Sequence, residues 1–258
     1  MSANTQLANI LTQGYAHFPQ ACAAPLVAAL CDEMERAFPY YAEKQRECGY
    51  TGTNDGGLHH VLCVGGAFLD LIQSLPASET IAEYFASKFI INSCGAFCST
   101  ANTAFYSNNV HRDIRTFSQG VPLMLNMIVM LDDFTPDNGA TFLLPKSHTR
   151  AERPEDAYFY GNSVRALGKS GDVVLFDSNL WHAGGRNTSS SQRRAVTLTL
   201  SRPYLKQQFD YATALGLENV AQMTDIQKQL LGYFARTPAS LNEWYQPAES
   251  RMYRAGQG

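Results

Sequence analysis

The feature that most constrains the fold is a series of short apolar runs between residues 89 and 205, separated by turn signals. The turns are clusters of Gly, Asn, Asp and Ser, which interrupt extended chain. No long helical pattern lies between the runs, and this argues against a parallel sheet built from βαβ units. The pattern predicts an antiparallel sandwich or jelly roll. We expect strands over residues 89–91, 122–131, 140–144, 172–176 and 194–200.

Helical patterns flank this β-rich region. The spacing of Leu26, Leu30 and Met34 predicts a helix over residues 23–38, and a second helix is expected over residues 79–88. Further along, Thr224 and Gln227 form the capping-box pattern of a short helix that ends near Gly232.

These segments predict a single, mainly β domain over residues 1–258 with flanking α-helices. It comprises a helical N-terminal part (about 1–88), a jelly-roll core (about 89–205) and a helical, aromatic C-terminal part (about 206–258). The aromatic residues of segment 238–253 are expected to pack on the body of the domain.

Composition excludes several classes of partner. The chain has 20 Lys and Arg against 23 Asp and Glu, and its longest basic run is Arg193–Arg194, so nucleic-acid binding is not expected. The longest apolar run, 121–131, is interrupted by Asn126 and is shorter than the roughly 20 residues that span a bilayer. The first twenty residues lack Lys and Arg, and the six cysteines are scattered, which favours a cytoplasmic protein with reduced thiols. A small-molecule substrate is the expected partner, and no feature indicates an oligomeric state.

Two histidines and an aspartate form a candidate metal site. His111 and Asp113 are two residues apart, so in an extended chain both side chains leave the same face. His182 follows the expected strand 172–176. Two imidazoles and one carboxylate form the facial triad of non-haem Fe(II) oxygenases, which leaves positions open for a co-substrate and O₂. Zinc would more often take a closed set of nitrogen and sulfur ligands.

Arg193 is a candidate anchor for a co-substrate carboxylate, because a guanidinium can bind a carboxylate through two hydrogen bonds. On the same strand, Thr197 and Thr199 would share its facing, while Arg194 would face the other way. Arg194 takes the role if the register is shifted by one residue. Asn126 and Thr141 are polar residues in apolar surroundings, and either binds the co-substrate or makes a structural hydrogen bond.

The segment 49–60 is rich in glycine and polar residues. We expect it to close over the metal and to contribute His60, with Tyr50 and Asn54, to substrate recognition. The alternative is a solvated linker without a binding role.

The motifs, taken in order, resemble a known family. His111-x-Asp113, NGATFLLPKSH (138–148), WHAGGRNTS (181–189) and Arg193 are similar to the phytanoyl-CoA dioxygenase family of Fe(II)/2-oxoglutarate-dependent oxygenases, over roughly residues 10–205. The resemblance implies a cupin-like double-stranded β-helix core. It also implies iron held by His111, Asp113 and His182, and 2-oxoglutarate held by Arg193. Family members often have Ser where this chain has Gly184.

The resemblance predicts hydroxylation of a small-molecule metabolite with release of succinate and CO₂. Asp113 favours hydroxylation over halogenation, because related halogenases have Ala or Gly where the carboxylate would be. The alternative is a non-redox, cupin-like protein that binds metal and either binds or isomerises a sugar. Such a protein would keep the metal ligands but would need no buried arginine, so Arg193 discriminates between the two.

Overall fold

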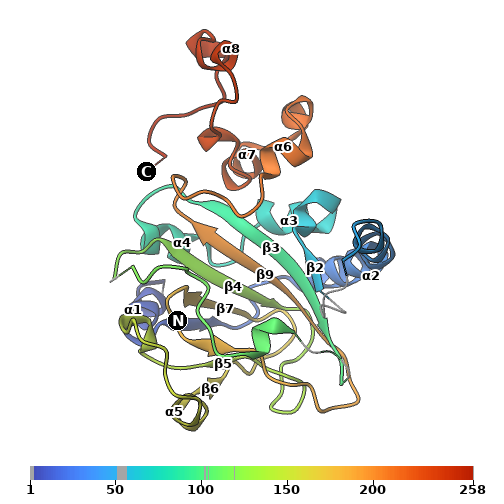
Figure 1. Ribbon diagram of the computed structural model, residues 1–258, viewed down its shortest axis with the longest axis vertical. Helices are drawn as coiled ribbons and strands as arrows, with labels where there is room; N and C mark the ends of the chain where they lie inside the picture. Colours follow the sequence, from blue (N-terminus) through green and yellow to red (C-terminus); the bar gives the residue numbers. More distant parts are fainter. Residues whose placement is uncertain (1–2, 51–56, 102, 104, 119, 258) are drawn as a thin grey trace.

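The structure is a computed structural model that describes residues 3–50, 57–101, 103, 105–118 and 120–257, and its centre is a pair of antiparallel sheets (Figure 1). The large sheet has the strand order β1-β7-β4-β9-β3-β2, and the small sheet has the order β6-β5-β8. This arrangement confirms the predicted jelly-roll core with flanking helices. The large sheet contains β1 (Tyr15–Phe18), β2 (Gly57–His59), β3 (Ile90–Ser99), β4 (Met124–Met130), β7 (Val173–Asp177) and β9 (Arg193–Ser201). The small sheet contains β5 (Phe142–Leu143), β6 (Val164–Arg165) and β8 (His182–Ala183).

Four N-terminal helices pack against one face of the large sheet, and the remaining helices lie after β5 and at the C-terminal end (Figure 1). The N-terminal helices are α1 (Ala3–Gln13), α2 (Ala24–Glu47), α3 (Ala67–Gln73) and α4 (Ser78–Phe85). The others are α5 (Asp156–Asn162), α6 (Tyr211–Leu215), α7 (Asp225–Leu230) and α8 (Leu241–Trp244).

The alternation of side chains along each strand separates two environments. On β4, Leu125, Met127 and Val129 join the large core under the helices, while Ile128 and Met130 belong to the smaller cluster between the sheets. Each fully buried aliphatic side chain contributes about 1.5–3 kcal/mol of transfer free energy. The helix-covered face therefore supplies most of the apolar burial, and the opposite face remains available for polar groups.

Two predicted boundaries, the ends of β3 and α2, are wrong, and two strands were not predicted. Strand β3 runs to Ser99 rather than ending at residue 91. After an irregularity between Ile91 and Ser93, its small and polar residues pair with β9 at seven further positions. Strands β1 and β2 also come from the N-terminal part, where only helices and loops were expected. Helix α2 continues past Pro39 to Glu47, with Lys44 and Arg46 in its last turn, where cations favour the helix C-terminus.

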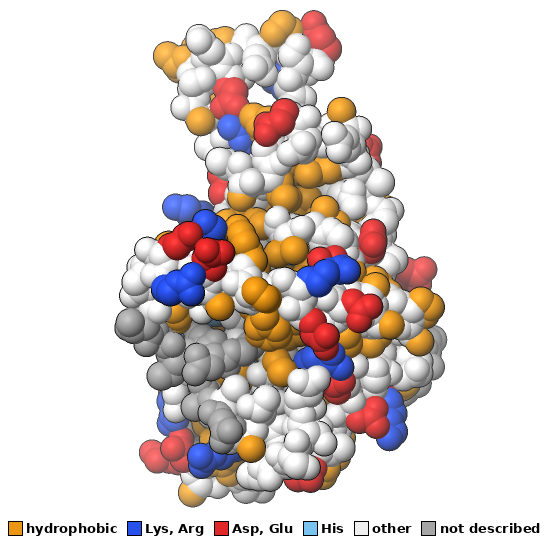
Figure 2. Space-filling model, turned by 90° about the vertical axis from the view of Figure 1, so that its right-hand side faces the viewer, with side chains coloured by type: hydrophobic (Ala, Val, Ile, Leu, Met, Phe, Trp, Pro, Cys, Tyr) orange, Lys and Arg blue, Asp and Glu red, His pale blue; other side chains and the backbone are white. Residues whose placement is uncertain are grey.

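The prediction for the C-terminal aromatic residues is also wrong. Trp244, Tyr245 and Tyr253 are 59%, 74% and 60% exposed, and the segment that carries α8 extends beyond the sheets (Figures 1 and 2). Other residues join this segment to the body: Met252 packs on the large core, and Arg254 donates to Asp225 and lies over the ring of Phe234. The capping box before α7 is present as predicted.

Acidic and basic side chains are interspersed on the face that Figure 2 shows. In the described part of the chain, the helices are all too short or too polar to cross a membrane.

Asp172 joins the N-terminal strand to the sheet. Its buried carboxylate accepts hydrogen bonds from the backbone and side chain of Gln20 (2.9 and 3.0 Å), from the backbone of Lys169 (2.9 Å) and from His17 (2.9 Å). Desolvation raises the pKa of Asp172, but these donors outweigh it and hold the pKa below its usual value.

We expect Asp172→Asn to lower the free energy of unfolding near neutral pH by about 1.5–3 kcal/mol, because hydrogen bonds to a charged group are lost. Since the folded-state pKa is depressed, this contribution is present above the unfolded pKa of about 3.9 and disappears as the pH falls through the lower value. Urea unfolding at several pH values measures it. The exposed Asp32→Asn is the control, and equal stability of the two variants would contradict the prediction.

Candidate metal centre and adjoining cavity

His111 and His182 are placed side by side by the backbone. Each donates its N–H to the other's carbonyl at 2.9 Å, which forms an isolated antiparallel bridge at the end of the small sheet. Their ring centroids are 4.2 Å apart. The backbone N–H of Asp113 donates to Ser178 at 3.2 Å, which turns its carboxylate toward the two rings.

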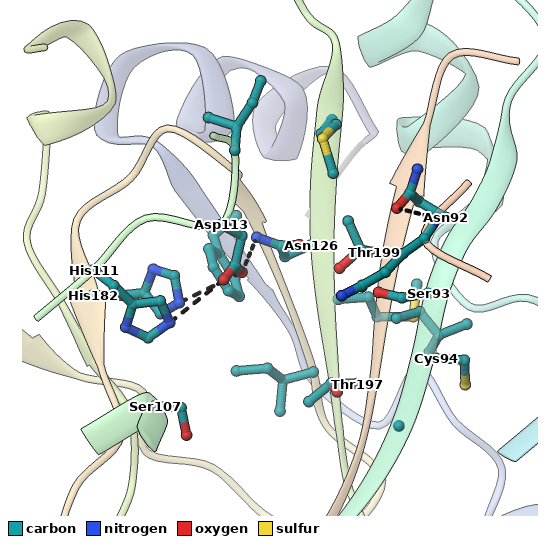
Figure 3. A pocket seen from close by; sticks show the side chains of 18 of the residues that line it. Asn92, Ser93, Cys94, Ser107, His111, Asp113, Asn126, His182, Thr197 and Thr199 are labelled. Carbon is teal, nitrogen blue, oxygen red and sulfur yellow. Dashed lines mark hydrogen bonds and ion pairs between the residues drawn. The ribbon is translucent and has the colours of Figure 1, made fainter. Parts of the chain in front are cut away.

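The potential ligand atoms of the three side chains converge (Figure 3). Asp113 Oδ1 lies 3.4 Å from His111 Nε2, and Asp113 Oδ2 lies 3.6 Å from His182 Nε2. The Nδ1 atoms face the carbonyl oxygens of Asn109 (2.7 Å) and Leu180 (2.9 Å). Because a carbonyl only accepts, each Nδ1 carries the proton, and each Nε2 keeps a free lone pair.

The protonation states of Asp113 and His182 suit a cation, whereas a metal must displace the proton that Asp113 favours on His111. Burial lowers the pKa of His182, and Asp113 offsets this only in part. Burial also lowers the pKa of His111, but the contacts with Asp113 and Asn109 outweigh it and raise the pKa overall. Desolvation raises the pKa of Asp113, yet the imidazoles and the amide of Asn126 outweigh it, so this pKa is lowered.

This donor set fits a divalent transition metal. Neighbouring ligands at right angles on an ion with bonds of about 2.1 Å lie about 3 Å apart, close to the observed separations. Nε2 lone pairs and an ionised carboxylate are the ligand types that such an ion takes.

Asn126 supports the aspartate from β4. Its Nδ2 donates to Asp113 Oδ2 at 2.8 Å, and an ionised carboxylate requires a donor at this position. Asn126 is 3% exposed, and within the described residues its Oδ1 accepts no hydrogen bond. The amide is thus oriented by Asp113 and leaves one buried acceptor unsatisfied.

A cavity of about 760 Å³ adjoins the triad, a size suited to small-molecule sites. Its lining includes most of the residues that the sequence singled out: His60, His111, Asp113, Asn126, Thr141, His182 and Arg193. Of the other two, Tyr50 is 48% exposed and does not line the cavity, and Asn54 lies outside the described residues.

Arg193 brings a buried positive charge to this cavity. It is 9% exposed, its guanidinium lies 4.5 Å from the ring centroid of Phe134, and burial lowers its pKa to about 10. No acidic side chain among the described residues forms an ion pair with it, and its Nε has no acceptor there. Arg194 faces the other way and bonds to Asp132 (2.9 Å) and Glu35 (3.2 Å).

His60 lies in the cavity wall but is engaged by the C-terminal part of the chain. Its ring stacks on Phe209 with centroids 4.3 Å apart, and its Nδ1 lies 3.2 Å from the hydroxyl of Tyr211. The neighbouring His59 packs edge-on against Phe97 at 5.9 Å.

Sequence reasoning missed four hydroxyl side chains of the lining, those of Ser93, Tyr106, Ser107 and Thr116. Ser93 lies on the part of β3 that was not predicted as strand. Alternation along the whole of β3 would have placed it on the same side as Gly95 and Phe97. The backbone carbonyl of Ser107 accepts a hydrogen bond from the N–H of Gly184 at 2.7 Å. The two residues are far apart in the sequence, so no local sequence pattern predicts this contact.

Comparison with known proteins places this geometry in a family. Residues 10–195 match the sequence profile of phytanoyl-CoA dioxygenase (PhyH). The chain belongs to this family. An uncharacterized protein of Mycobacterium tuberculosis is 39% identical over 181 residues, which are 70% of this chain and 65% of that protein. The dioxygenase cdmD of Talaromyces verruculosus is 31% identical over 122 residues, 47% of this chain and 39% of that protein. The chain thus spans less than two thirds of the length of these relatives.

Several solved structures share this fold. SnoN, a non-heme alpha ketoglutarate dependent epimerase from nogalamycin biosynthesis, aligns with a TM-score of 0.60 and 17% identity over 77% of this chain and 80% of its own. AviO1 from Streptomyces viridochromogenes aligns with a TM-score of 0.56 and 17% identity over 79% of this chain and 96% of its own. At this identity the alignments establish the shared fold.

The guanidinium of Arg193 has no acidic partner among the residues that the structure describes, and this leads to a stability prediction. Replacing a buried, uncompensated charge with an apolar side chain of similar volume removes a desolvation penalty. We therefore expect Arg193→Leu to raise the free energy of unfolding of the ligand-free protein by about 1–4 kcal/mol. Urea unfolding without metal or organic acids measures this value. The control, Arg194→Leu, should lower stability because it breaks contacts with Asp132 and Glu35, and a destabilised Arg193→Leu protein would contradict the prediction.

Proposed function

We propose that this protein is an Fe(II)/2-oxoglutarate-dependent oxygenase that hydroxylates a small molecule and releases succinate and CO₂. The observation that carries the proposal is one cavity that contains both an open His–Asp–His site and a buried arginine without an acidic partner among the described residues. A metal site alone is compatible with many reactions. The buried guanidinium favours an anionic co-substrate, because such a ligand would supply the missing negative charge.

In this proposal His111, Asp113 and His182 hold Fe(II). Bound iron supplies the activation of O₂ and the oxidation of a substrate C–H bond, chemistry that side chains lack. The carbonyls of Asn109 and Leu180 keep both Nε2 lone pairs directed at the metal position. Asn126 holds one carboxylate oxygen of Asp113 and so restricts its rotation.

Arg193 binds the distal carboxylate of 2-oxoglutarate. Its fork can donate two parallel hydrogen bonds, and burial strengthens them by excluding water. Thr141, on the same cavity, is the proposed second contact. Asn126 assists the co-substrate indirectly, through Asp113. Family members often have a serine at the position of Gly184, which has no hydroxyl. Ser107, which contacts Gly184, provides a hydroxyl in the same cavity wall.

Arg193 also favours this proposal over a non-redox, cupin-like binding protein or isomerase. A metal-dependent sugar-binding protein or isomerase gains nothing from a buried cation that costs stability. A solved structure of SnoN with Fe³⁺ and alpha ketoglutarate supports the proposed pair of ligands on this fold. The substrate-binding role of His60, Tyr50 and Asn54 stays a prediction.

The direct test is optical. Anaerobic addition of Fe(II) and then 2-oxoglutarate should produce a weak visible charge-transfer band from the chelate. Succinate should be released once O₂ and a substrate are added. A solution that stays colourless would favour the non-redox alternative.

We expect Asp113→Ala to abolish coupled hydroxylation, because the site loses its only charged ligand and the imidazoles hold iron less well. Folding should survive, since the Asp113 side chain is partly exposed. Fe(II) affinity, the chelate band and circular dichroism are measured together. Hydroxylation close to the wild-type level, without added chloride or carboxylate, would remove Asp113 from the ligand set.

Arg193→Ala should raise the 2-oxoglutarate concentration for half-maximal turnover by about tenfold or more, because a charge-assisted pair contributes about 1.5–3 kcal/mol. Arg193→Lys should recover only part of the loss, since an ammonium lacks the planar fork. Arg194→Ala is the matched control on the opposite face. If Arg194→Ala had a larger effect than Arg193→Ala, the carboxylate would bind Arg194, and the proposed role of Arg193 would be wrong.

A further inference from the structure

A row of polar side chains crosses the cavity side of the large sheet. Asn126 on β4 is paired with Thr199 on β9, and Thr199 is paired with Ser93 on β3. Figure 3 shows Asp113, Asn126, Thr199 and Ser93 in succession. Because neighbouring strands are about 4.8 Å apart, the row is about 10 Å wide. It forms a polar floor that begins at the triad.

The floor has unused hydrogen-bonding capacity. Ser93 and Thr199 are partly exposed residues, and neither hydroxyl bonds to the described part of the chain. No donor from the described residues reaches the buried Oδ1 of Asn126. Nearby Asn92 differs, since its amide is fully used by Ser201, Lys206 and Gln208. The two hydroxyls and Asn126 Oδ1 therefore make no structural hydrogen bonds to the described chain, unlike the amide of Asn92.

The charge around the floor disfavours an anionic ligand there. The acceptor of Asn126, which no donor from the described residues reaches, would repel a carboxylate or phosphate. Burial lowers the pKa of His59 and His60 in the adjoining wall, so both imidazoles are uncharged near neutral pH. The two basic side chains at this part of the cavity, Arg115 and Lys206, are exposed to solvent.

We propose that Ser93, Thr199 and Asn126 form a substrate subsite for an uncharged, polyhydroxylated molecule, such as a glycoside or polyol. Substrate hydroxyls donate to Asn126 Oδ1 and exchange hydrogen bonds with Ser93 and Thr199, which holds a neighbouring C–H bond at the triad. The buried acceptor is the deciding group, because only a ligand with a donor satisfies it. The inference rests on the proposed function for its chemistry, but the subsite itself is defined without iron.

The test compares neutral and anionic probes. Ligand-observed NMR, which requires neither metal nor turnover, screens methyl glycosides and polyols against the matched uronic and aldonic acids, with an acyl-CoA thioester as a further probe. We expect neutral members to bind and their acids to bind about tenfold more weakly or not at all. The best neutral probe is then titrated into Ser93→Ala, Thr199→Val and the double variant. Each hydroxyl lost should weaken binding by about three- to tenfold.

Thr12→Val, which removes an exposed hydroxyl that bonds within helix α1, is the control and should bind as the wild type does. Preference for the acids or the thioester, no neutral binder, or unchanged affinity in the double variant overturns the subsite. The chelate band is recorded for the same proteins. A missing band with intact neutral binding refutes the oxygenase and keeps the subsite, whereas an intact band without neutral binding does the reverse.

Discussion

The structure depends on covering one face of the large sheet with helices while the other face stays open to a cavity. Strand side chains alternate, so each central strand sends every second residue under α1–α4 and the rest toward the small sheet. The covered face is continuous and apolar, as shown by Leu125, Met127 and Val129 on β4. Since that face holds the sheet together, the inward positions can carry an amide, hydroxyls and a guanidinium.

The site itself opposes folding at two points. Arg193 is a buried cation without an acidic partner in the described chain, and Asn126 keeps a buried acceptor without a donor. Each such group costs free energy in the absence of a ligand. The same groups become favourable contacts when a ligand supplies the missing charge or donor. These residues therefore lower the stability of the free protein and raise its affinity for ligands. The apolar core beneath the helices supplies the stability that they cost.

The sequence predicted the central strands β4, β7 and β9 to within two residues, because their apolar runs are bounded by clear turns. It placed Arg193 and Arg194 on opposite faces through alternation alone. It missed most of β3, since Asn92, Ser93 and Gly95 are poor strand formers whose extended state comes from pairing with β9. The contact between His111 and His182 is a long-range backbone bridge, which no local pattern encodes. Sequence patterns therefore identified the candidate ligands, but only the fold shows how they meet.

The positions of Arg193 and Thr199 on one strand separate the two binding tasks. They share the inward face of β9 but are six residues apart, about 20 Å along the strand. Thr199 is paired with Asn126, which bonds to Asp113, so the triad lies at the Thr199 end. In the proposed function, 2-oxoglutarate held by Arg193 would extend along this face toward the triad, and the row from Asn126 to Ser93 stays free for another ligand. We expect substitutions in that row to change substrate binding with little effect on co-substrate binding. The row and Arg193 are separate sets of side chains that meet only at the metal position.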